Sequence, residues 1–255
     1  FSDSDKLGPI PIDSNFECSV PEEYGQSIDV LFVGNSYTYY NNLPQLISNI
    51  ALSFGDTVNT ESSTPGGASF YGHVNNATTL AKINQQPWDY VVLQDQSQKP
   101  SLSPSYVATN VYPYATQLVD AIQLNNSCTE PVFYMTWGRK NGDASNCAAY
   151  PPVCTYLGMQ QRLRESYLEM GITNSATVSP VGMAWKNYME LDSITDLYNA
   201  DGSHPSIYGS YLAACTFYAT IFKKSPIGST FIPSQAEQSI GDIERWFIPC
   251  SELIH

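Results

Sequence analysis

The stretch Ile28-Asp29-Val30-Leu31-Phe32-Val33-Gly34-Asn35-Ser36, residues 28–36, places an apolar run directly before a turn and a serine. The run is short and rich in β-branched and aromatic residues, which predicts a strand that is buried on both faces. A helical pattern follows over residues 43–54. Strand, tight turn, polar residue and helix put that polar residue at the carboxyl edge of a parallel sheet, where α/β proteins carry out chemistry. Ser36 is therefore a candidate nucleophile, and the competing interpretation is a serine that only caps a turn.

Apolar runs and helical patterns alternate along the rest of the chain. The predicted strands cover residues 28–33, 57–61, 89–94, 131–136 and 176–181, and the predicted helices cover residues 43–54, 75–84, 104–124, 156–170 and 205–222. This alternation predicts an α/β fold with a mainly parallel sheet flanked by helices. We expect one domain over residues 1–255, with segments 1–27 and 225–255 as extensions packed on it. Residues 138–155 lack periodicity and predict a long surface loop.

The charge balance limits the partners that the protein can have. Lys and Arg number 11 against 24 Asp and Glu, which gives a formal net charge of −13 and disfavours nucleic acid as a partner. No apolar stretch reaches the roughly 18 residues that a membrane span needs. The first residue is Phe1, as expected for a mature, processed product. We therefore expect a secreted or otherwise extracytoplasmic protein, with a monomer favoured.

Six cysteines, at positions 18, 128, 147, 154, 215 and 250, form no Cys-x-x-Cys pattern. Disulfides are expected in preference to a metal site. Cys147 and Cys154 flank a proline-rich loop and form the first predicted disulfide, and Cys18 with Cys250 would tie the two ends of the chain together. Cys215 lies in an apolar helical pattern and is equally expected to be a buried thiol, so the pairing of the cysteine at position 128 stays open.

A serine hydroxyl needs a base that takes its proton, and an acid that holds the base. The candidate bases are His73, His204 and His255, the only three histidines. His255 is the last residue, and no acid lies close to His73 in the sequence. Asp201 precedes His204 by three residues, an offset that places both side chains on one side of a turn and lets the carboxylate fix the imidazole tautomer. The alternative is an Asp-Gly turn followed by a histidine at a helix start.

Five blocks of the sequence, in order, resemble the SGNH, or GDSL-like, hydrolase family. The blocks are "GNSYTYYNNLP" (34–44), "TPGGAS" (64–69), "WDYVVLQDQSQ" (88–98), "YMTWGRK" (134–140) and "DGSHPSIYGSYLAA" (201–214). The resemblance implies a three-layer α/β/α sandwich of the flavodoxin-like kind and ester hydrolysis through an acyl-enzyme. It also implies that Ser36 is the nucleophile, His204 the base and Asp201 the orienting acid.

The same resemblance implies an oxyanion hole made of the Ser36 and Gly67 backbone N–H groups and one side-chain amide. The family pattern Gly-x-Asn supplies that amide after the third strand, whereas this chain has Gln94-Asp95-Gln96-Ser97-Gln98. A glutamine amide offers the same donors one methylene further out, so Gln96 or Gln98 is expected to take this role, with Gln96 preferred.

Trp137 and Arg139 follow the fourth predicted strand and are candidate substrate-binding residues. The arginine pairs either with an acidic substrate group or with a structural carboxylate. The function expected is a serine esterase that removes short acyl groups, above all O-acetyl, from carbohydrate or another polyhydroxylated substrate. Acyl transfer, lipase or thioesterase activity on the same triad and a non-catalytic carbohydrate-binding protein are the alternatives. No cofactor and no metal are expected.

Overall fold

A five-stranded parallel sheet forms the centre of the computed structural model, which describes residues 25–191 and 194–234. The strand order is β2-β1-β3-β4-β5, and every neighbouring pair is parallel. The strands are β1 (Ser27–Val33), β2 (Thr57–Ser63), β3 (Tyr90–Leu93), β4 (Glu130–Tyr134) and β5 (Thr177–Ser179). The predicted α/β fold is confirmed, and its strand order is that of flavodoxin-like proteins.

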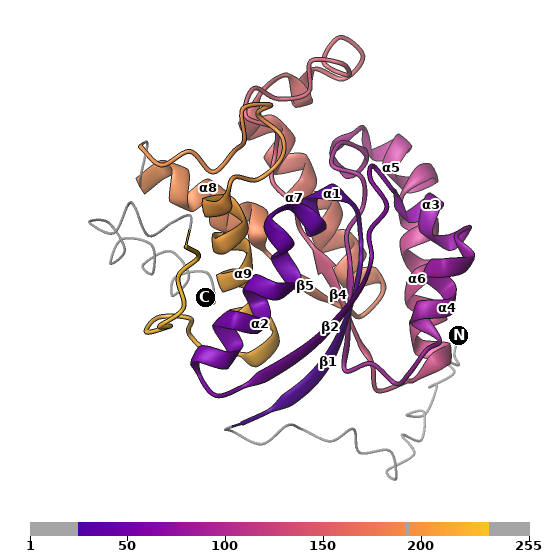
Figure 1. Ribbon diagram of the computed structural model, residues 1–255. Coiled ribbons are helices and arrows are strands. Elements are labelled where there is room, and N and C mark those ends of the chain that lie inside the picture. Colours follow the sequence, from indigo (N-terminus) through magenta and orange to yellow (C-terminus); the bar gives the residue numbers. More distant parts are fainter. Residues whose placement is uncertain (1–24, 192–193, 235–255) are drawn as a thin grey trace, which may run out of the picture.

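Helices cover both faces of the sheet, so the three-layer arrangement is confirmed (Figure 1). The α-helices are α1 (Ser36–Tyr39), α2 (Leu43–Ser53), α3 (Phe70–Val74), α4 (Ala77–Ile83), α5 (Pro104–Asn110), α6 (Tyr112–Asn125), α7 (Tyr156–Thr173), α8 (Val181–Leu191) and α9 (Ile207–Phe222), and the 3-10 helices are η1 (Tyr40–Asn42), η2 (Lys99–Ser101) and η3 (Pro151–Cys154). Helices α2 and α9 lie on one side of the sheet, and α3, α4 and α6 lie on the other (Figure 1).

The alternation of side chains along β1 explains why this strand is apolar throughout. Val30 and Phe32 pack into the core beneath α2, α8 and α9, while Leu31 and Val33 pack into the core beneath α6 and α7. Successive side chains of a strand point to opposite faces, so a strand covered by helices on both faces needs apolar residues at consecutive positions.

Two of the predicted ranges each span two elements in the structure. The strand expected over residues 176–181 ends at Ser179, because Pro180 opens α8, a helix that the sequence analysis did not predict. The Pro180 carbonyl accepts hydrogen bonds from Met183 and Ala184, as the carbonyl before a helix does. The single helix expected over residues 104–124 is two helices, α5 and α6, because Val111 leaves helical geometry and Pro113 begins a new first turn.

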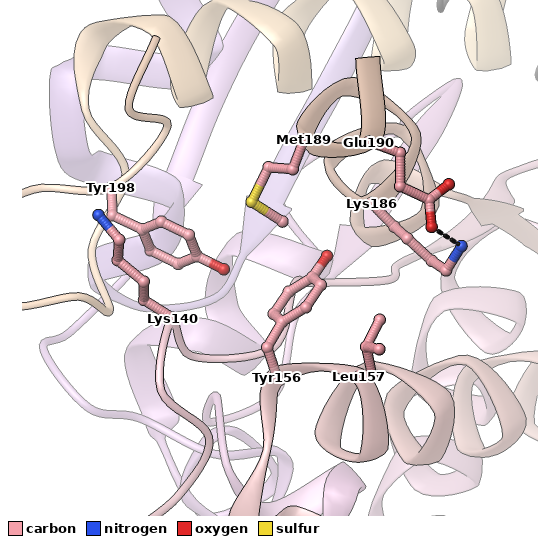
Figure 2. A pocket seen from close by; sticks show the side chains of 7 residues that line it. All are labelled: Lys140, Tyr156, Leu157, Lys186, Met189, Glu190 and Tyr198. Carbon is pink, nitrogen blue, oxygen red and sulfur yellow. Dashed lines mark hydrogen bonds and ion pairs between the residues drawn. The ribbon is translucent and has the colours of Figure 1, made fainter. Parts of the chain in front are cut away.

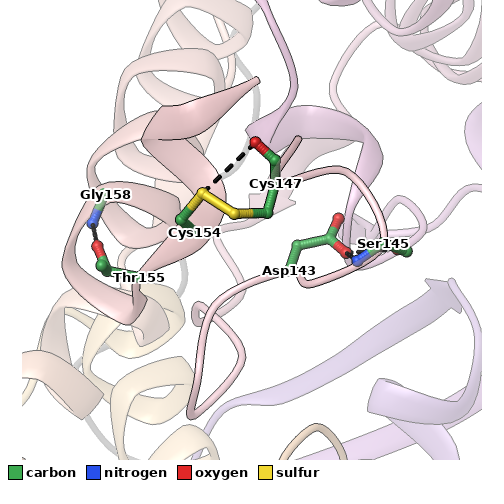
Figure 3. The surroundings of a disulfide bond; sticks show 6 residues. All are labelled: Asp143, Ser145, Cys147, Cys154, Thr155 and Gly158. Atoms are coloured by element: carbon green, nitrogen blue, oxygen red, sulfur yellow. Dashed lines mark hydrogen bonds between the residues drawn. A yellow bond between two sulfur atoms is a disulfide. The ribbon is translucent and has the colours of Figure 1, made fainter. Parts of the chain in front are cut away.

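The predicted disulfide between Cys147 and Cys154 is confirmed and closes part of the long loop after β4 (Figure 3). Cys215 is buried in α9, and the suggested link between Cys18 and Cys250 lies outside the described residues, as do most of the two expected extensions. In the stretches 25–191 and 194–234, no helix has both the length and the apolar character needed to cross a membrane.

Candidate active site

The turn after β1 places Ser36 at the first position of α1, half-buried at the carboxyl edge of the sheet. Strand β1 lies between β2 and β3, where the strand order reverses direction, and this is the place at which open α/β sheets bind their ligands. A side chain at position 34 would lie 2.6 Å from Thr38 Oγ1 and 2.7 Å from Gln94 Oε1, so the turn needs glycine there. Asn35 caps α1, because its side chain accepts a hydrogen bond from the Tyr37 amide.

The loop before α9 brings His204 and Asp201 to Ser36. His204 Nε2 lies 2.9 Å from Ser36 Oγ, and His204 Nδ1 lies 2.5 Å from Asp201 Oδ2. Because the carboxylate accepts at Nδ1, the proton of a neutral imidazole lies on that nitrogen, and Nε2 is left to accept from the serine hydroxyl. The structure therefore brings together the three residues that the sequence analysis selected.

The Asp201 carboxylate is also held by the backbone. Its Oδ1 accepts hydrogen bonds from the amides of Ser203 and His204, both at 2.9 Å. Partial burial acts to raise the pKa of Asp201, but the hydrogen bonds from the His204 side chain and from the two amides outweigh it and leave the pKa below its ordinary value. A backbone bridge between Tyr198 and Pro205 closes the loop that carries both residues.

Beneath the nucleophile turn lies a layer of buried polar side chains. His73, which the sequence analysis left without a partner, is 2.9 Å from the Gly34 carbonyl through Nε2 and 2.9 Å from Thr79 Oγ1 through Nδ1. Because the Gly34 carbonyl can only accept a hydrogen bond, the proton of the neutral ring lies on Nε2. Burial lowers the pKa of His73, and the hydrogen bond to the Gly34 carbonyl acts in the opposite direction. Gln94 Oε1 accepts from the Asn35 amide at 3.0 Å. These bonds fix the orientation of the Gly34 carbonyl and the Asn35 amide, which directly precede Ser36 in the turn.

The loop of residues 64–69 is tied to the turn and to the end of β3. Asn35 Nδ2 donates to the Ala68 carbonyl at 2.8 Å, and Asp95 Oδ1 accepts from the Phe70 amide at 2.7 Å. Burial raises the pKa of Asp95 to about 6, against the bond from Phe70 and the charge of Lys99. Gly67 has φ +68, a conformation that favours glycine, and the space beside it is open. Its backbone is therefore accessible.

The two candidate glutamines differ in their remaining donors. Gln98 Nε2 donates to Asp143 Oδ1 at 2.8 Å and to Ser145 Oγ at 3.0 Å, which uses both of its amide hydrogens. Gln96 Nε2 donates to Gln98 Oε1 at 3.0 Å and keeps its second hydrogen. This difference favours Gln96 over Gln98 as the side-chain amide that could donate a hydrogen bond to an oxyanion.

The interpretation of Trp137 as a substrate contact is wrong. Its side chain is 0% exposed and stacks on Trp185 at 3.8 Å and on Tyr37 at 4.7 Å between ring centroids. The indole lies three residues beyond the end of β4 and faces the core, where it supports the base loop by donating from Nε1 to the Ser203 carbonyl at 3.0 Å. Ser203 Oγ in turn lies 2.7 Å from the Tyr37 hydroxyl.

Arg139 lies half-buried between the loops that follow β3 and β4. Its Nη2 is 3.4 Å from Ser97 Oγ, and its Nε is buried without a hydrogen-bond partner among the described residues. Among those same residues, no carboxylate lies within ion-pair distance of the guanidinium. Asp143 lies further away and already accepts from Gln98, Ser145 and Asn146. The guanidinium therefore has polar contacts within the protein but no ion pair among the described residues.

Tyr40 and Asn41, which the sequence analysis did not select, contact the base loop. The Tyr40 ring stacks on the His204 imidazole with 4.3 Å between ring centroids and an interplanar angle of 17°. Asn41 Nδ2 donates to the Pro205 carbonyl at 3.1 Å and to Ser210 Oγ at 2.9 Å. The one sequence signal for this contact is the pair Asn41-Asn42 directly before a helix with proline in its first turn, since asparagine tolerates left-handed backbone.

A pocket of about 310 Å³ lies beside the base loop and contains none of the predicted site residues (Figure 2). Its walls include Tyr156, Leu157, Met189 and Tyr198, and both of its lysines form ion pairs with carboxylates. Lys186 pairs with Glu190 at 2.6 Å, and Lys140 pairs with Asp196 at 2.5 Å. The part of the chain that the structure describes holds no group of three His, Cys, Asp or Glu side chains placed to bind a metal ion.

No protein-family model matches this sequence, and no curated protein matches it. Solved structures do match. A protein from Slackia heliotrinireducens, assigned to the SGNH hydrolases, is 27% identical with a TM-score of 0.61, and the match covers 77% of this chain and all of that one. A DUF4886 family protein from Bacteroides uniformis has 18% identity and a TM-score of 0.74 over 90% of this chain and 96% of that one. The acetyl xylan esterase AlAXEase has 16% identity and a TM-score of 0.55 over 75% and 98%.

Proposed function

Because the chain has the fold of the SGNH hydrolases, and 77% of it matches the whole length of one of them, we propose that it is a serine esterase, a carboxylic ester hydrolase that acts through an acyl-enzyme. The observation that carries the proposal is the continuous path from Ser36 Oγ to His204 Nε2 at 2.9 Å and from His204 Nδ1 to Asp201 Oδ2 at 2.5 Å. A nucleophile, a base and an orienting acid in this order are what acyl transfer to serine requires.

In this mechanism Ser36 Oγ attacks the ester carbonyl while His204 takes its proton. The imidazolium then protonates the leaving alcohol, and water repeats the sequence on the acyl-enzyme with His204 again as the base. Asp201 stabilises the imidazolium and keeps the proton of the neutral ring on Nδ1. Each oxyanion donor is worth about 3 kcal/mol in the transition state.

Three donors are proposed for the oxyanion. The Ser36 amide is the first of a helix and has no helical carbonyl to bond, and the Gly67 amide lies on an open loop. The third donor is the unused amide hydrogen of Gln96, whose oxygen is held by the amides of Gln98 and Lys99 at 2.9 and 3.2 Å. Those two bonds fix the side-chain amide, so that it needs little reorganisation during the reaction.

For the substrate we propose short acyl esters, above all O-acetyl, of a carbohydrate or a related polyhydroxylated molecule. The structural neighbour AlAXEase is an acetyl xylan esterase, and the half-buried Arg139 guanidinium, which has no carboxylate partner among the described residues, suits an oxygen-rich or acidic substrate group. We place the protein outside the cytoplasm, since the disulfide between Cys147 and Cys154 is typical of oxidising compartments.

The test is the release of 4-nitrophenol from acetyl, butyryl and octanoyl esters by the wild type and by Ser36→Ala. We expect turnover that falls with acyl length and is lost in the alanine variant, whose folding is checked by circular dichroism. Peracetylated sugars and xylan acetate follow as natural-type substrates. Equal rates for the two proteins would contradict the proposal, whereas release only when an acceptor alcohol is added would point to acyl transfer on the same residues.

A further inference from the structure

We propose that Tyr40 and Asn41 form a clamp on the catalytic base, in which Tyr40 positions the His204 imidazole and Asn41 fixes the loop that carries it. The inference rests on the proposed function, since it assigns a role to residues that act through His204. Neither residue touches the reacting atoms of the substrate in this scheme, so both are positioning residues.

The stacking geometry is the first observation. The Tyr40 ring lies nearly parallel to the imidazole at 4.3 Å, and the Tyr37 ring meets the same imidazole edge-on at 5.6 Å and 69°. Two aromatic rings in different orientations restrict the tilt of the imidazole, which its hydrogen bond to Asp201 alone leaves open. Asp201 is the only charged group among the described residues that is shown to contact the imidazole. The aromatic face also attracts the cation that forms when His204 takes a proton.

The backbone of the segment is the second observation. Asn41 and Asn42 both have φ 52, and two consecutive left-handed residues other than glycine are uncommon, although asparagine tolerates this conformation better than most L-amino acids. Such strain persists where surrounding contacts enforce it, and it is often found at functional sites. Here the contacts are the two hydrogen bonds from Asn41 Nδ2, to the Pro205 carbonyl and to Ser210 Oγ.

The position of the clamp in the chain explains how it could link the nucleophile to the base. Tyr40 lies four residues after Ser36, whereas His204 is 168 residues away from Ser36 in the sequence. The side chains of His204 and Asp201 are 26% and 48% exposed, so burial in the core does not by itself fix the base. A segment that continues directly from the nucleophile and grips the base loop sets the distance between Ser36 Oγ and His204 Nε2, and an error of about 1 Å there costs on the order of a hundredfold in rate.

The first experiment compares Tyr40→Leu with Tyr40→Phe, which keeps the ring. In Tyr40→Leu we expect kcat on 4-nitrophenyl acetate to fall about tenfold with KM unchanged within about twofold. The rate at which diethyl 4-nitrophenyl phosphate modifies Ser36 should fall by the same factor. Tyr40→Phe should retain both rates. Tyr71→Leu is the matched control, because this tyrosine on α3 is exposed and its ring contact is with Tyr114.

The second experiment compares Asn41→Gly with Asn42→Gly. Both glycines accept the left-handed backbone, but only the first removes the hydrogen bonds to Pro205 and Ser210. We expect Asn41→Gly to lower kcat about three- to tenfold and Asn42→Gly to leave it within about twofold of the wild type.

The outcomes separate the clamp from the proposed function. If Ser36→Ala is inactive but Tyr40→Leu keeps full kcat, or loses only substrate affinity, the clamp is wrong and the esterase proposal stands. If the wild type hydrolyses no ester, the esterase proposal fails, and the stack is tested by NMR alone. The Cε1–H signal of His204 should lose its ring-current shift in Tyr40→Leu and keep it in Tyr40→Phe, and an unchanged signal in Tyr40→Leu would overturn the clamp.

Discussion

Asp201 accepts three hydrogen bonds, one from the base and two from the backbone, and this pattern makes a specific prediction for Asp201→Asn. The asparagine can still accept from the amides, but its Nδ2 would donate toward His204 Nδ1 and favour the tautomer with the proton on Nε2. That tautomer cannot accept from Ser36. We expect kcat to fall by roughly 10³- to 10⁴-fold with little change in the melting temperature. Steady-state kinetics beside a thermal melt tests this, and a loss of activity that merely follows unfolding would contradict it.

The raised pKa of Asp95 predicts how the free energy of unfolding depends on pH. Its pKa is raised by burial from 3.8 to about 6, and Oδ2 is buried without a hydrogen-bond partner among the described residues. A raised carboxyl pKa means that its contribution to stability is complete below the unfolded value and is lost as the pH rises through about 6. Asp95→Asn keeps an acceptor for the Phe70 amide and has no charge. The variant should therefore gain up to about 3 kcal/mol relative to the wild type between pH 3.5 and pH 7.5.

Urea unfolding at several pH values measures that difference. A difference between Asp95→Asn and the wild type that does not change with pH would show that the carboxyl is not titrating over this range. Asp120→Asn, at a position on α6 away from the nucleophile turn, serves as the control for the removal of one negative charge.

At this scale the sequence identified the residues whose chemistry is rare and missed those whose role depends on distant contacts. Ser36 and His204 stood out because a serine follows a buried strand and because there are only three histidines. Trp137 was misplaced, since it lies three residues beyond the end of β4, and no sequence rule tells whether a side chain past the end of a strand faces the core or the cleft. Tyr40 reaches His204 only through the folded loop, and the sequence holds no signal for a contact over that separation.

The first turn of α9 links helix stability to the geometry of the site. Ser206 caps this helix by accepting from the Gly209 amide at 3.3 Å, and it donates to the Asp196 carbonyl at 2.8 Å. Ser206→Ala should cost about 1–2 kcal/mol in the free energy of unfolding. Because the cap lies two residues after His204, we also expect kcat to fall several-fold.

The cap of α5 provides the matched comparison. Ser103 accepts from the Tyr106 amide at 3.3 Å, and its helix carries no residue of the candidate site. Ser103→Ala should lower the stability by a similar amount and leave kcat unchanged. Chemical denaturation and steady-state kinetics on both variants test this difference. Equal losses of kcat would show that Ser206→Ala lowers activity only by reducing the amount of folded protein.

At the scale of elements, long periodic patterns were predictable and short transitions were not. Helices α2, α7 and α9 agree with the predicted ranges to within a few residues, because each repeats its apolar face over several turns. Strand β5 has three residues and is followed at once by Pro180 and α8, so the apolar run over residues 176–181 belongs to two elements. A run that short does not reveal where a strand stops and a helix starts.

For the molecule as a whole, the disulfide between Cys147 and Cys154 adds stability to a loop that reaches the site. The bond closes a loop with a sequence separation of seven, for which the chain-entropy model gives about 2.5 kcal/mol. Asp143 lies just before this closed loop and is joined to it, since its amide donates to the Val153 carbonyl at 2.7 Å, and its Oδ1 accepts from Gln98 Nε2 at 2.8 Å. Replacement of both cysteines by serine should lower the free energy of unfolding by about 2 kcal/mol and raise KM more than it lowers kcat. Unchanged denaturant midpoints would show that the loop is held by its other contacts.

The long separation between Ser36 and His204 has a consequence for how activity appears in time. Strands β1 and β2 are close in the sequence and pair with each other. The base, in contrast, lies in the loop that leads into α9, a helix near the other end of the described residues that packs against α2. Contacts between distant segments form late, since they require the largest loop closure. During refolding, ester hydrolysis should therefore lag behind the recovery of secondary structure, and the length of the lag should report how long α9 and the loop before it take to dock.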